Sequence, residues 1–285
     1  MASEQNSNSE APDAAELAER YYDSDDADRF YHAIWGGEDI HVGCYERPDE
    51  PIREASRRTV ERMAELCSLD PSTKVLDLGA GYGGAARYLA SRYGCPVTCL
   101  NLSEIQNTRN RELNAAVGLS DRIDVLHASF EDIPRPDGSY DLIWSQDAIL
   151  HSAQREQTLV EARRVLRRGG SLLFTDPMQS DDCPDGVLKP VLDRIHLSSL
   201  GSFAYYRATL ARLGFVEKRI INLTPQLIRH YTRVRDELKR RRADLDGRVS
   251  SEYIERMTAG LDHWISAGEK GYLAWGILEF RLPPH

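Results

Sequence analysis

Short apolar runs alternate with longer amphipathic stretches through the middle of the chain. The runs favour β-strands because turn residues bound them, and the stretches favour helices because their apolar positions recur every three or four residues. Strands separated by helices of about ten or more residues need crossover connections, which produce a mostly parallel sheet with both faces covered. The pattern therefore predicts an α/β fold. The seven expected strands are 74–78, 97–102, 123–129, 140–146, 171–175, 218–223 and 272–280.

The same pattern divides the chain into four parts. Residues 1–16 are small, polar and acidic, and we expect a disordered tail because they cannot bury enough apolar surface to offset the entropy of ordering. Aromatic residues at near-helical spacing predict an N-terminal helical cap over 17–72. Two amphipathic helices at 225–270 interrupt the connection between the sixth and seventh strands and predict a helical lid. The expected core consists of residues 73–224 together with 271–285.

The first strand ends in Asp77 and a turn rich in glycine, which opens into a helix. Glycine is needed where the backbone bends sharply or approaches a ligand, and a helix N-terminus supplies unpaired N–H groups. The turn therefore predicts a ligand cradle at the strand ends, where open parallel sheets bind ligands. Its glycines alone leave a nucleotide, a dinucleotide or no ligand open, because Gly79, Gly81 and Gly84 satisfy the G-x-G-x-x-G spacing.

Composition and charge narrow the possible partners. The formal net charge of −9 argues against a nucleic-acid partner, whose binding surface is normally basic. The five cysteines are scattered, without a C-x-x-C pair or histidines at metal-ligand spacing, so they predict reduced thiols in a cytoplasm and no metal site. The N-terminus does not resemble a signal peptide, and no stretch approaches the roughly 20 apolar residues of a membrane span. Monomer and homodimer both stay open.

A set of short motifs is more specific than the glycine turn. The motifs are the segments 35–43 (WGGEDIHVG), 100–103 (LNLS), 106–107 (QN), 144–152 (WSQDAILHS), 175–179 (TDPMQ), 192–202 (LDRIHLSSLGS) and 271–278 (GYLAWGIL). From about residue 21 to its C-terminus the chain resembles the sarcosine/dimethylglycine N-methyltransferases, which are class I enzymes that make glycine betaine. The resemblance implies a Rossmann-like sheet, S-adenosylmethionine as cofactor and a small-molecule amine as substrate.

The resemblance also implies which residues hold the cofactor. Gly79, Ala80 and Gly81 would contact its methionine part, next to Asp77 at the strand end. Asn101 stands where an acidic residue usually accepts both ribose hydroxyls, and an amide can accept from one hydroxyl and donate to the other. The other expected contacts are Leu102 with the ribose and Gln106 nearby, Ser129 and Phe130 with the adenine, and Gln146 with the amino-acid moiety.

Methyl transfer to an amine needs a nitrogen lone pair aligned with the sulfonium, so the site must favour the neutral amine. His151 and Asp176, at the ends of the fourth and fifth strands, are the available pair for relaying the proton away. The alternative is that His151 only caps the helix that follows it.

The substrate carboxylate needs a charge-assisted donor, preferably an arginine that binds both oxygens. Arg194 and Arg207 are the candidates, with His230 behind them. Aromatic faces bind quaternary ammonium groups such as that of betaine. The candidates for this wall are Tyr22, Trp35, Tyr206 and Tyr231, with Met178 at the same strand end. For the N-terminal aromatics, packing against the core is an equally good interpretation.

We therefore expect an N-methyltransferase that acts on sarcosine or dimethylglycine. The closest enzymatic alternative is a small-molecule O-methyltransferase, in which His151 and Asp176 form a general-base pair for a hydroxyl. An alternative of another class is a regulatory subunit that binds the cofactor without catalysis.

Overall fold

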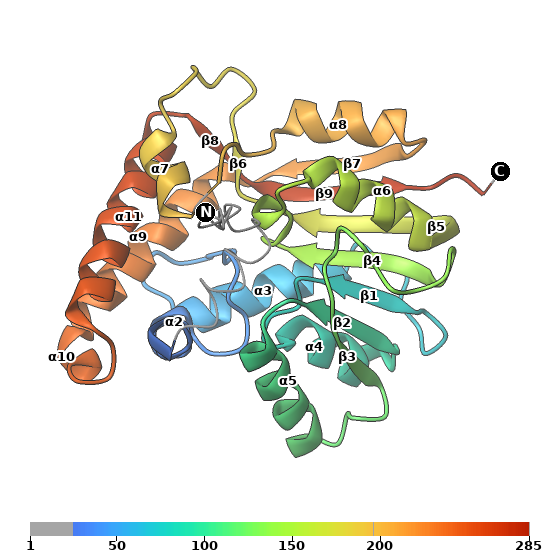
Figure 1. Cartoon of the computed structure of the whole chain (residues 1–285), viewed down its shortest axis with the longest axis horizontal. Coiled ribbons are helices and arrows are strands. Elements are labelled where there is room, and N and C mark those ends of the chain that lie inside the picture. The colour runs from blue at the N-terminus through green and yellow to red at the C-terminus, as the bar shows by residue number, and fades with distance from the viewer. Residues whose placement is uncertain (1–24, 196, 285) are drawn as a thin grey trace, which may run out of the picture.

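The computed structural model of the protein describes residues 25–195 and 197–284 (Figure 1). The expected tail at 1–16 and the candidate Tyr22 lie outside these residues. The main sheet has seven strands in the order β3-β2-β1-β4-β5-β9-β7, and β9 runs antiparallel to both of its neighbours. Its strands are β1 (Val75–Leu78), β2 (Val97–Asn101), β3 (Ile123–His127), β4 (Tyr140–Gln146), β5 (Leu166–Thr175), β7 (Val216–Asn222) and β9 (Gly276–Arg281). The predicted seven-stranded, mostly parallel sheet is confirmed.

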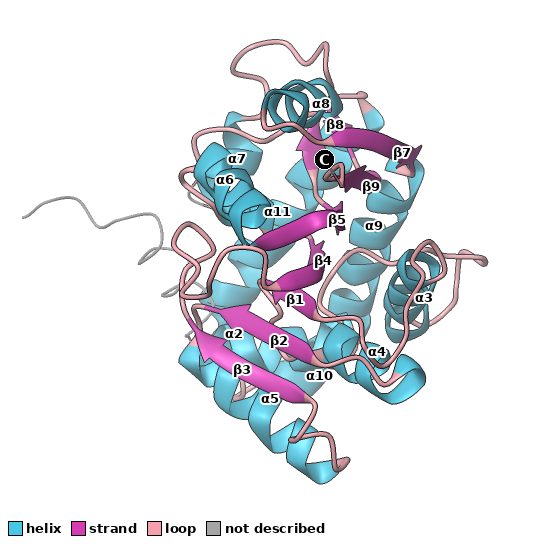
Figure 2. Cartoon of the chain, turned by 90° about the vertical axis from the view of Figure 1, so that its right-hand side faces the viewer, coloured by secondary structure: helices cyan, strands magenta, loops and turns pink. Residues whose placement is uncertain are grey.

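Successive strand residues point to opposite sides of the sheet, and in this sheet the residues on both sides are apolar. Leu76, Ile143 and Leu172 belong to one buried cluster, and their chain neighbours Val75, Leu142 and Leu173 belong to another. Figure 2 shows helices on both sides of the stacked strands. The first cluster includes side chains of α6 (Arg155–Val165) and α8 (Phe203–Arg212), and the second includes side chains of α3 (Ile52–Ala64) and α4 (Gly84–Tyr93).

A third apolar cluster lies away from the sheet. It packs the first described helices of the chain against helices from its C-terminal part. It contains residues of α2 (Asp25–Phe30) and η1 (Tyr31–Trp35), and of α7 (Lys189–Arg194), α9 (Thr224–Arg240), α10 (Arg242–Leu245) and α11 (Ser251–Glu269). In Figure 1, α9 and α11 run side by side at one end of the sheet. These two helices lie between β7 and β9 in the chain, as expected, and their function as a lid stays a prediction. None of the described helices combines the length and apolar character that crossing a membrane requires.

The expected last strand at 272–280 is divided in two. β8 (Leu273–Ala274) pairs with β6 (Met178–Gln179) in a small separate sheet, and β9 begins after Trp275. The reason is the Trp275 side chain, which is fully buried and donates its indole N–H to Asp147 at 2.8 Å. The fifth strand also differs from its expected range of 171–175, since β5 begins at Leu166 and includes Gly169 and Gly170.

Candidate active site

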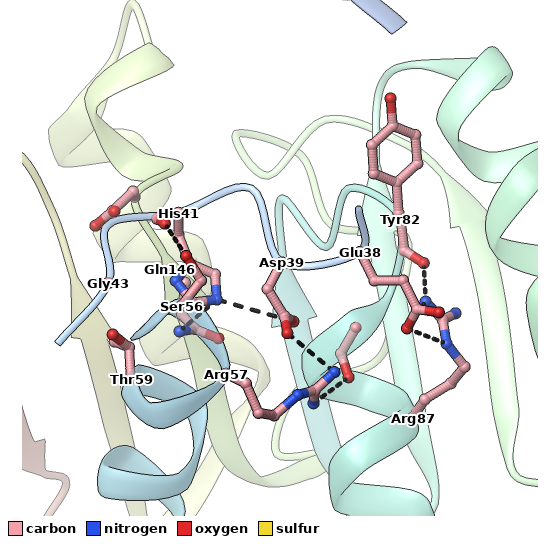
Figure 3. A network of polar contacts seen from close by, with 12 residues as sticks. Glu38, Asp39, His41, Gly43, Ser56, Arg57, Thr59, Tyr82, Arg87 and Gln146 are labelled. Atoms are coloured by element: carbon pink, nitrogen blue, oxygen red, sulfur yellow. Dashed lines mark hydrogen bonds and ion pairs between the residues drawn. The ribbon is translucent and has the colours of Figure 1, made fainter. Parts of the chain in front are cut away.

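A loop from the N-terminal part, residues 38–43, crosses the glycine turn, and we call it the strap (Figure 3). Two ion pairs hold its first residues: Glu38 Oε2 lies 3.0 Å from Arg87 Nη2, and Asp39 Oδ2 lies 2.9 Å from Arg57 Nη2. Two hydroxyl groups of α3 hold its carbonyls, since Ser56 donates to the His41 oxygen and Thr59 to the Val42 oxygen. The strap is therefore fixed to both helices on this side of the sheet.

The glycine turn has the geometry that its sequence predicts. Gly79 and Gly81 have positive φ angles of 73° and 53°, and a Cβ on Gly79 would lie 2.3 Å from the Ala148 Cβ. Gly84 has a different reason to be glycine, because a Cβ there would lie 2.1 Å from Asp39 Oδ1 of the strap. Gly84, which completes the G-x-G-x-x-G spacing, is thus required by a contact within the protein. Its presence is therefore no evidence that the turn binds a dinucleotide.

A first cavity opens beside this turn at the carboxyl ends of β1, β2 and β4. It brings together eight of the ten predicted cofactor residues, namely Gly79, Gly81, Asn101, Leu102, Gln106, Ser129, Phe130 and Gln146. Asp77 and Ala80 do not belong to its lining. The sequence interpretation missed Ile40, Ser103, Glu131, Asp147 and Ala148, which complete the wall.

Two amide side chains of this wall orient each other. Asn101 Nδ2 donates to Gln106 Oε1 at 3.0 Å, and Ser103 caps α5 (Glu104–Ala116) by accepting from the Gln106 backbone N–H. The cavity therefore combines apolar faces with fixed amide and hydroxyl groups. This set of groups suits an adenosine, whose base is flat and whose ribose both donates and accepts hydrogen bonds.

A second cavity adjoins the first, and four tyrosine and tryptophan residues form part of its lining. Ile40, Asp147 and His151 belong to both linings, so these three side chains form a common wall. The other residues of the second cavity are Tyr31, Trp35, His41, Val42, Leu150, Pro177, Arg194, Ile195, Tyr231 and Trp264.

Asp147 is the most important residue that the sequence interpretation missed. It is the only described residue other than glycine with a positive φ, at 53°, and its carboxylate accepts three hydrogen bonds. The donors are the Val42 backbone N–H at 2.7 Å, the Thr175 hydroxyl at 2.7 Å and the Trp275 indole at 2.8 Å. Burial raises the pKa of Asp147 above its usual value. Its position directly after the fourth strand was the available signal.

The expected pair of His151 and Asp176 is divided between two environments. His151 lines both cavities, and burial lowers its pKa to about 4, so its imidazole is neutral at physiological pH. Asp176 is fully buried outside both linings and accepts from the Leu150 N–H at 2.9 Å and the Tyr206 hydroxyl at 2.5 Å. Asp176 therefore supports the turn that carries His151 and does not face the cavities.

The predicted substrate residues are also divided. Trp35 and Arg194 line the second cavity, and His230 is fully buried behind Trp35, with ring centroids 5.1 Å apart. Tyr206 and Met178 belong to neither cavity lining, and both are fully buried in the core of the sheet. Arg207 also lies outside both linings, and its exposed side chain pairs with Glu217 of β7 at 2.9 Å.

The side chain of Asp77 is buried beneath the glycine turn, at 3% exposed. Burial, followed by the nearby charge of Asp39, raises its pKa to about 7. The pKa of Asp77 in the folded protein therefore lies above the roughly 3.9 of an aspartate in the unfolded chain, and the folded protein holds the proton more tightly. The free energy of unfolding that Asp77 contributes is greatest below about pH 3.9 and is lost as the pH rises towards 7.

We expect Asp77→Asn to increase the free energy of unfolding at pH 8, by an amount on the order of 1–4 kcal/mol, and to flatten its dependence on pH between about 4 and 7. Chemical denaturation at pH 5 and pH 8 measures both effects. Asp121→Asn, at an exposed position, is the matched control and should change stability by less than about 0.5 kcal/mol. A loss of stability in Asp77→Asn at pH 8 would contradict the argument.

Comparisons with known proteins agree with this geometry. Residues 76–174 match the family described as Methyltransferase domain. The sarcosine/dimethylglycine N-methyltransferase of Halorhodospira halochloris is 59% identical over 94% of this chain and 96% of its own length. The dimethylglycine N-methyltransferase of Parasynechococcus marenigrum is 48% identical over 95% of this chain and 97% of its own.

A crystal structure from Galdieria sulphuraria, assigned as a sarcosine dimethylglycine methyltransferase, superposes with a TM-score of 0.88 at 45% identity. That superposition covers 93% of this chain and 100% of the other. The relatives extend over nearly the whole chain, including the strap and the helices between β7 and β9. The chain therefore belongs to the sarcosine/dimethylglycine N-methyltransferase family.

Proposed function

We propose that the protein methylates the nitrogen of sarcosine, dimethylglycine or both, with S-adenosylmethionine as methyl donor and glycine betaine as the final product. The observation that carries this function is the pair of adjacent cavities with a common wall of Ile40, Asp147 and His151. S-adenosylmethionine, when bound, supplies an electrophilic methyl group on a sulfonium. Two cavities that meet at three side chains suit a transfer between two small molecules that must be aligned.

The first cavity is the candidate site for the cofactor. Gly79 and Gly81 allow the backbone to approach the methionine part closely, and Gln146 at the end of β4 would hold its amino-acid group. Asn101, whose orientation Gln106 fixes, would bind the ribose hydroxyls. Ser129 and Phe130 would flank the adenine.

The second cavity is the candidate site for the amine. The aromatic residues of its wall suit a methylated ammonium group, and the guanidinium of Arg194 suits a carboxylate. Trp35 and Trp264 each have a buried indole N–H without a hydrogen-bond partner in the described part of the chain. Since an unsatisfied buried donor costs about 1–3 kcal/mol, a ligand that carries acceptor oxygens would be favoured here. A small amino acid with a methylated nitrogen has both features.

The common wall would prepare the amine for methylation. The carboxylate of Asp147 attracts the substrate cation into the second cavity, and the imidazole of His151, which burial keeps neutral, can accept a hydrogen bond from the ammonium group. With a substrate bound, the strap would help to exclude water from the junction, which would strengthen these electrostatic interactions. In the O-methyl alternative Asp176 would have to activate His151, whereas both of its oxygens already accept hydrogen bonds from Leu150 and Tyr206.

The purified protein incubated with S-adenosylmethionine and, separately, glycine, sarcosine or dimethylglycine tests the proposal. Mass spectrometry should detect dimethylglycine from sarcosine or betaine from dimethylglycine. Cofactor binding without methylation of any of the three amines would contradict it and would favour a regulatory subunit. Methylation of a hydroxyl compound alone would favour the O-methyl alternative.

A further inference from the structure

A chain of hydrogen bonds connects the strap to the cofactor wall (Figure 3). The Trp144 indole lies 2.9 Å from Gln146 Oε1, Gln146 Nε2 lies 3.1 Å from His41 Nε2, and His41 Nδ1 lies 3.2 Å from the Val42 oxygen. Gln146 lines the first cavity and His41 lines the second. The chain therefore runs from one cavity to the other.

The direction of every hydrogen bond in this chain is determined. An indole N–H can only donate, so the Trp144 bond identifies the Gln146 oxygen as its acceptor and leaves the Gln146 NH₂ facing His41. A backbone carbonyl can only accept, so His41 carries its proton on Nδ1 and donates to Val42. His41 Nε2 is consequently the acceptor for Gln146.

The surroundings keep His41 in this orientation. His41 is 7% exposed, and the Ser56 hydroxyl donates to the His41 backbone oxygen. Charged and titratable groups face His41 from three segments. Asp39 Oδ1 of the strap lies 4.0 Å from His41 Nε2, and Asp147, directly after β4, and His230 of α9 interact with it electrostatically. Arg57 holds the Asp39 carboxylate, so that this charge is already paired.

We propose that His41 is a positioning residue that couples the two cavities. Through its Nε2 it fixes the Gln146 amide on the cofactor wall, and through the strap it fixes Ile40 and Val42 on the amine wall. The inference rests on the proposed function and adds to it that the two ligands bind cooperatively. A ligand in either cavity would fix the orientation of the Gln146–His41 side-chain pair, and the second ligand would then bind to a pair that is already held.

Binding of S-adenosylhomocysteine to the full chain, measured by calorimetry with and without saturating dimethylglycine, tests the coupling without turnover. Coupling between sites typically changes affinity by a factor of about 5–150, and we expect dimethylglycine to raise the wild-type affinity roughly 5- to 10-fold. His41→Gln should keep this ratio within about twofold, because its Oε1 reaches the position of Nε2 and can accept from Gln146. The shorter side chain of His41→Asn reaches only the position of Nδ1, so the hydrogen bond to Gln146 is lost. This variant should bring the affinity ratio close to one.

The two variants have similar polarity, and thermal unfolding should give both nearly the same midpoint. A wild-type ratio of one would overturn the inference, and so would a normal ratio in His41→Asn. Loss of coupling in both variants would also contradict it, because the acceptor at Nε2 would then not be the cause. If the wild-type protein bound neither ligand, the proposed function itself would fail, which is a different result from binding without coupling.

Discussion

Asp147→Asn is expected to lower kcat/KM for dimethylglycine by roughly 10²- to 10³-fold, the range found when a group that stabilises charge at the reacting centre is removed. Among the residues that the structure describes, Asp147 carries the only carboxylate that lines both cavities, and the substitution removes its charge. It also leaves one amide NH₂ among three donors, from Val42, Thr175 and Trp275, where the carboxylate accepts from all of them. Steady-state kinetics with both substrates measures the loss.

The charge and the geometry of Asp147 can be separated with two ligands of nearly the same shape. S-adenosylmethionine carries a positive sulfonium and S-adenosylhomocysteine a neutral sulfur, so the variant should lose more affinity for the first than for the second. Asp141→Asn at the opposite end of β4 is the matched control, and its kcat/KM should stay within about threefold of wild type. A folded Asp147→Asn protein that keeps kcat/KM within tenfold would remove Asp147 from the mechanism.

The pH dependence gives a second measurement of the same residue. Burial raises the pKa of Asp147, and catalysis needs its ionised form. The rate should therefore fall on acidification at a higher pH than an ordinary aspartate would give, and this acidic limb should be absent in Asp147→Asn. An unchanged acidic limb in the variant would assign it to another group.

The sheet and the cofactor side of the site could be predicted because their signals are local. Each strand is a short apolar run, and residues such as Asn101 and Gln146 stand directly at strand ends, which parallel pairing brings to one edge. Gly79 needs its positive φ for the turn to which it belongs. None of these inferences requires knowledge of a distant contact.

The substrate side depended on contacts between distant segments. Asp147 accepts from Trp275, which is 128 residues later in the chain, and no pattern around either residue predicts that bond. Tyr206 looked like a wall residue because helix periodicity cannot say whether an aromatic faces a cavity or the core, and the structure buries it against Phe174. Gly84 seemed to belong to a ligand motif, whereas its neighbour is Asp39 of the strap.

The choice between the arginine candidates Arg194 and Arg207 also depended on contacts that local sequence does not reveal. Arg194 lies on α7 and Arg207 on α8, and a position on a short helix does not say which arginine faces a cavity. The structure directs Arg194 into the second cavity because its stem passes beside Gly260 of α11, where a Cβ would lie 2.1 Å from Arg194 Cδ. We expect Arg194→Met to raise the KM for dimethylglycine roughly 10²-fold, because truncating one partner of a buried charge pair costs about 2–5 kcal/mol.

Because the guanidinium would hold the carboxylate and not the reacting nitrogen, kcat and cofactor affinity should change much less than the KM for the amine. Arg207→Met makes the same change of charge at the residue paired with Glu217, and its kinetics should stay within about twofold of wild type. Gly260→Ala tests the position by a different route, since the added methyl group must displace the Arg194 stem and should raise the same KM with the charge intact. If Arg194→Met affected kcat alone, or if Arg207→Met matched its effect, the carboxylate would have to bind elsewhere.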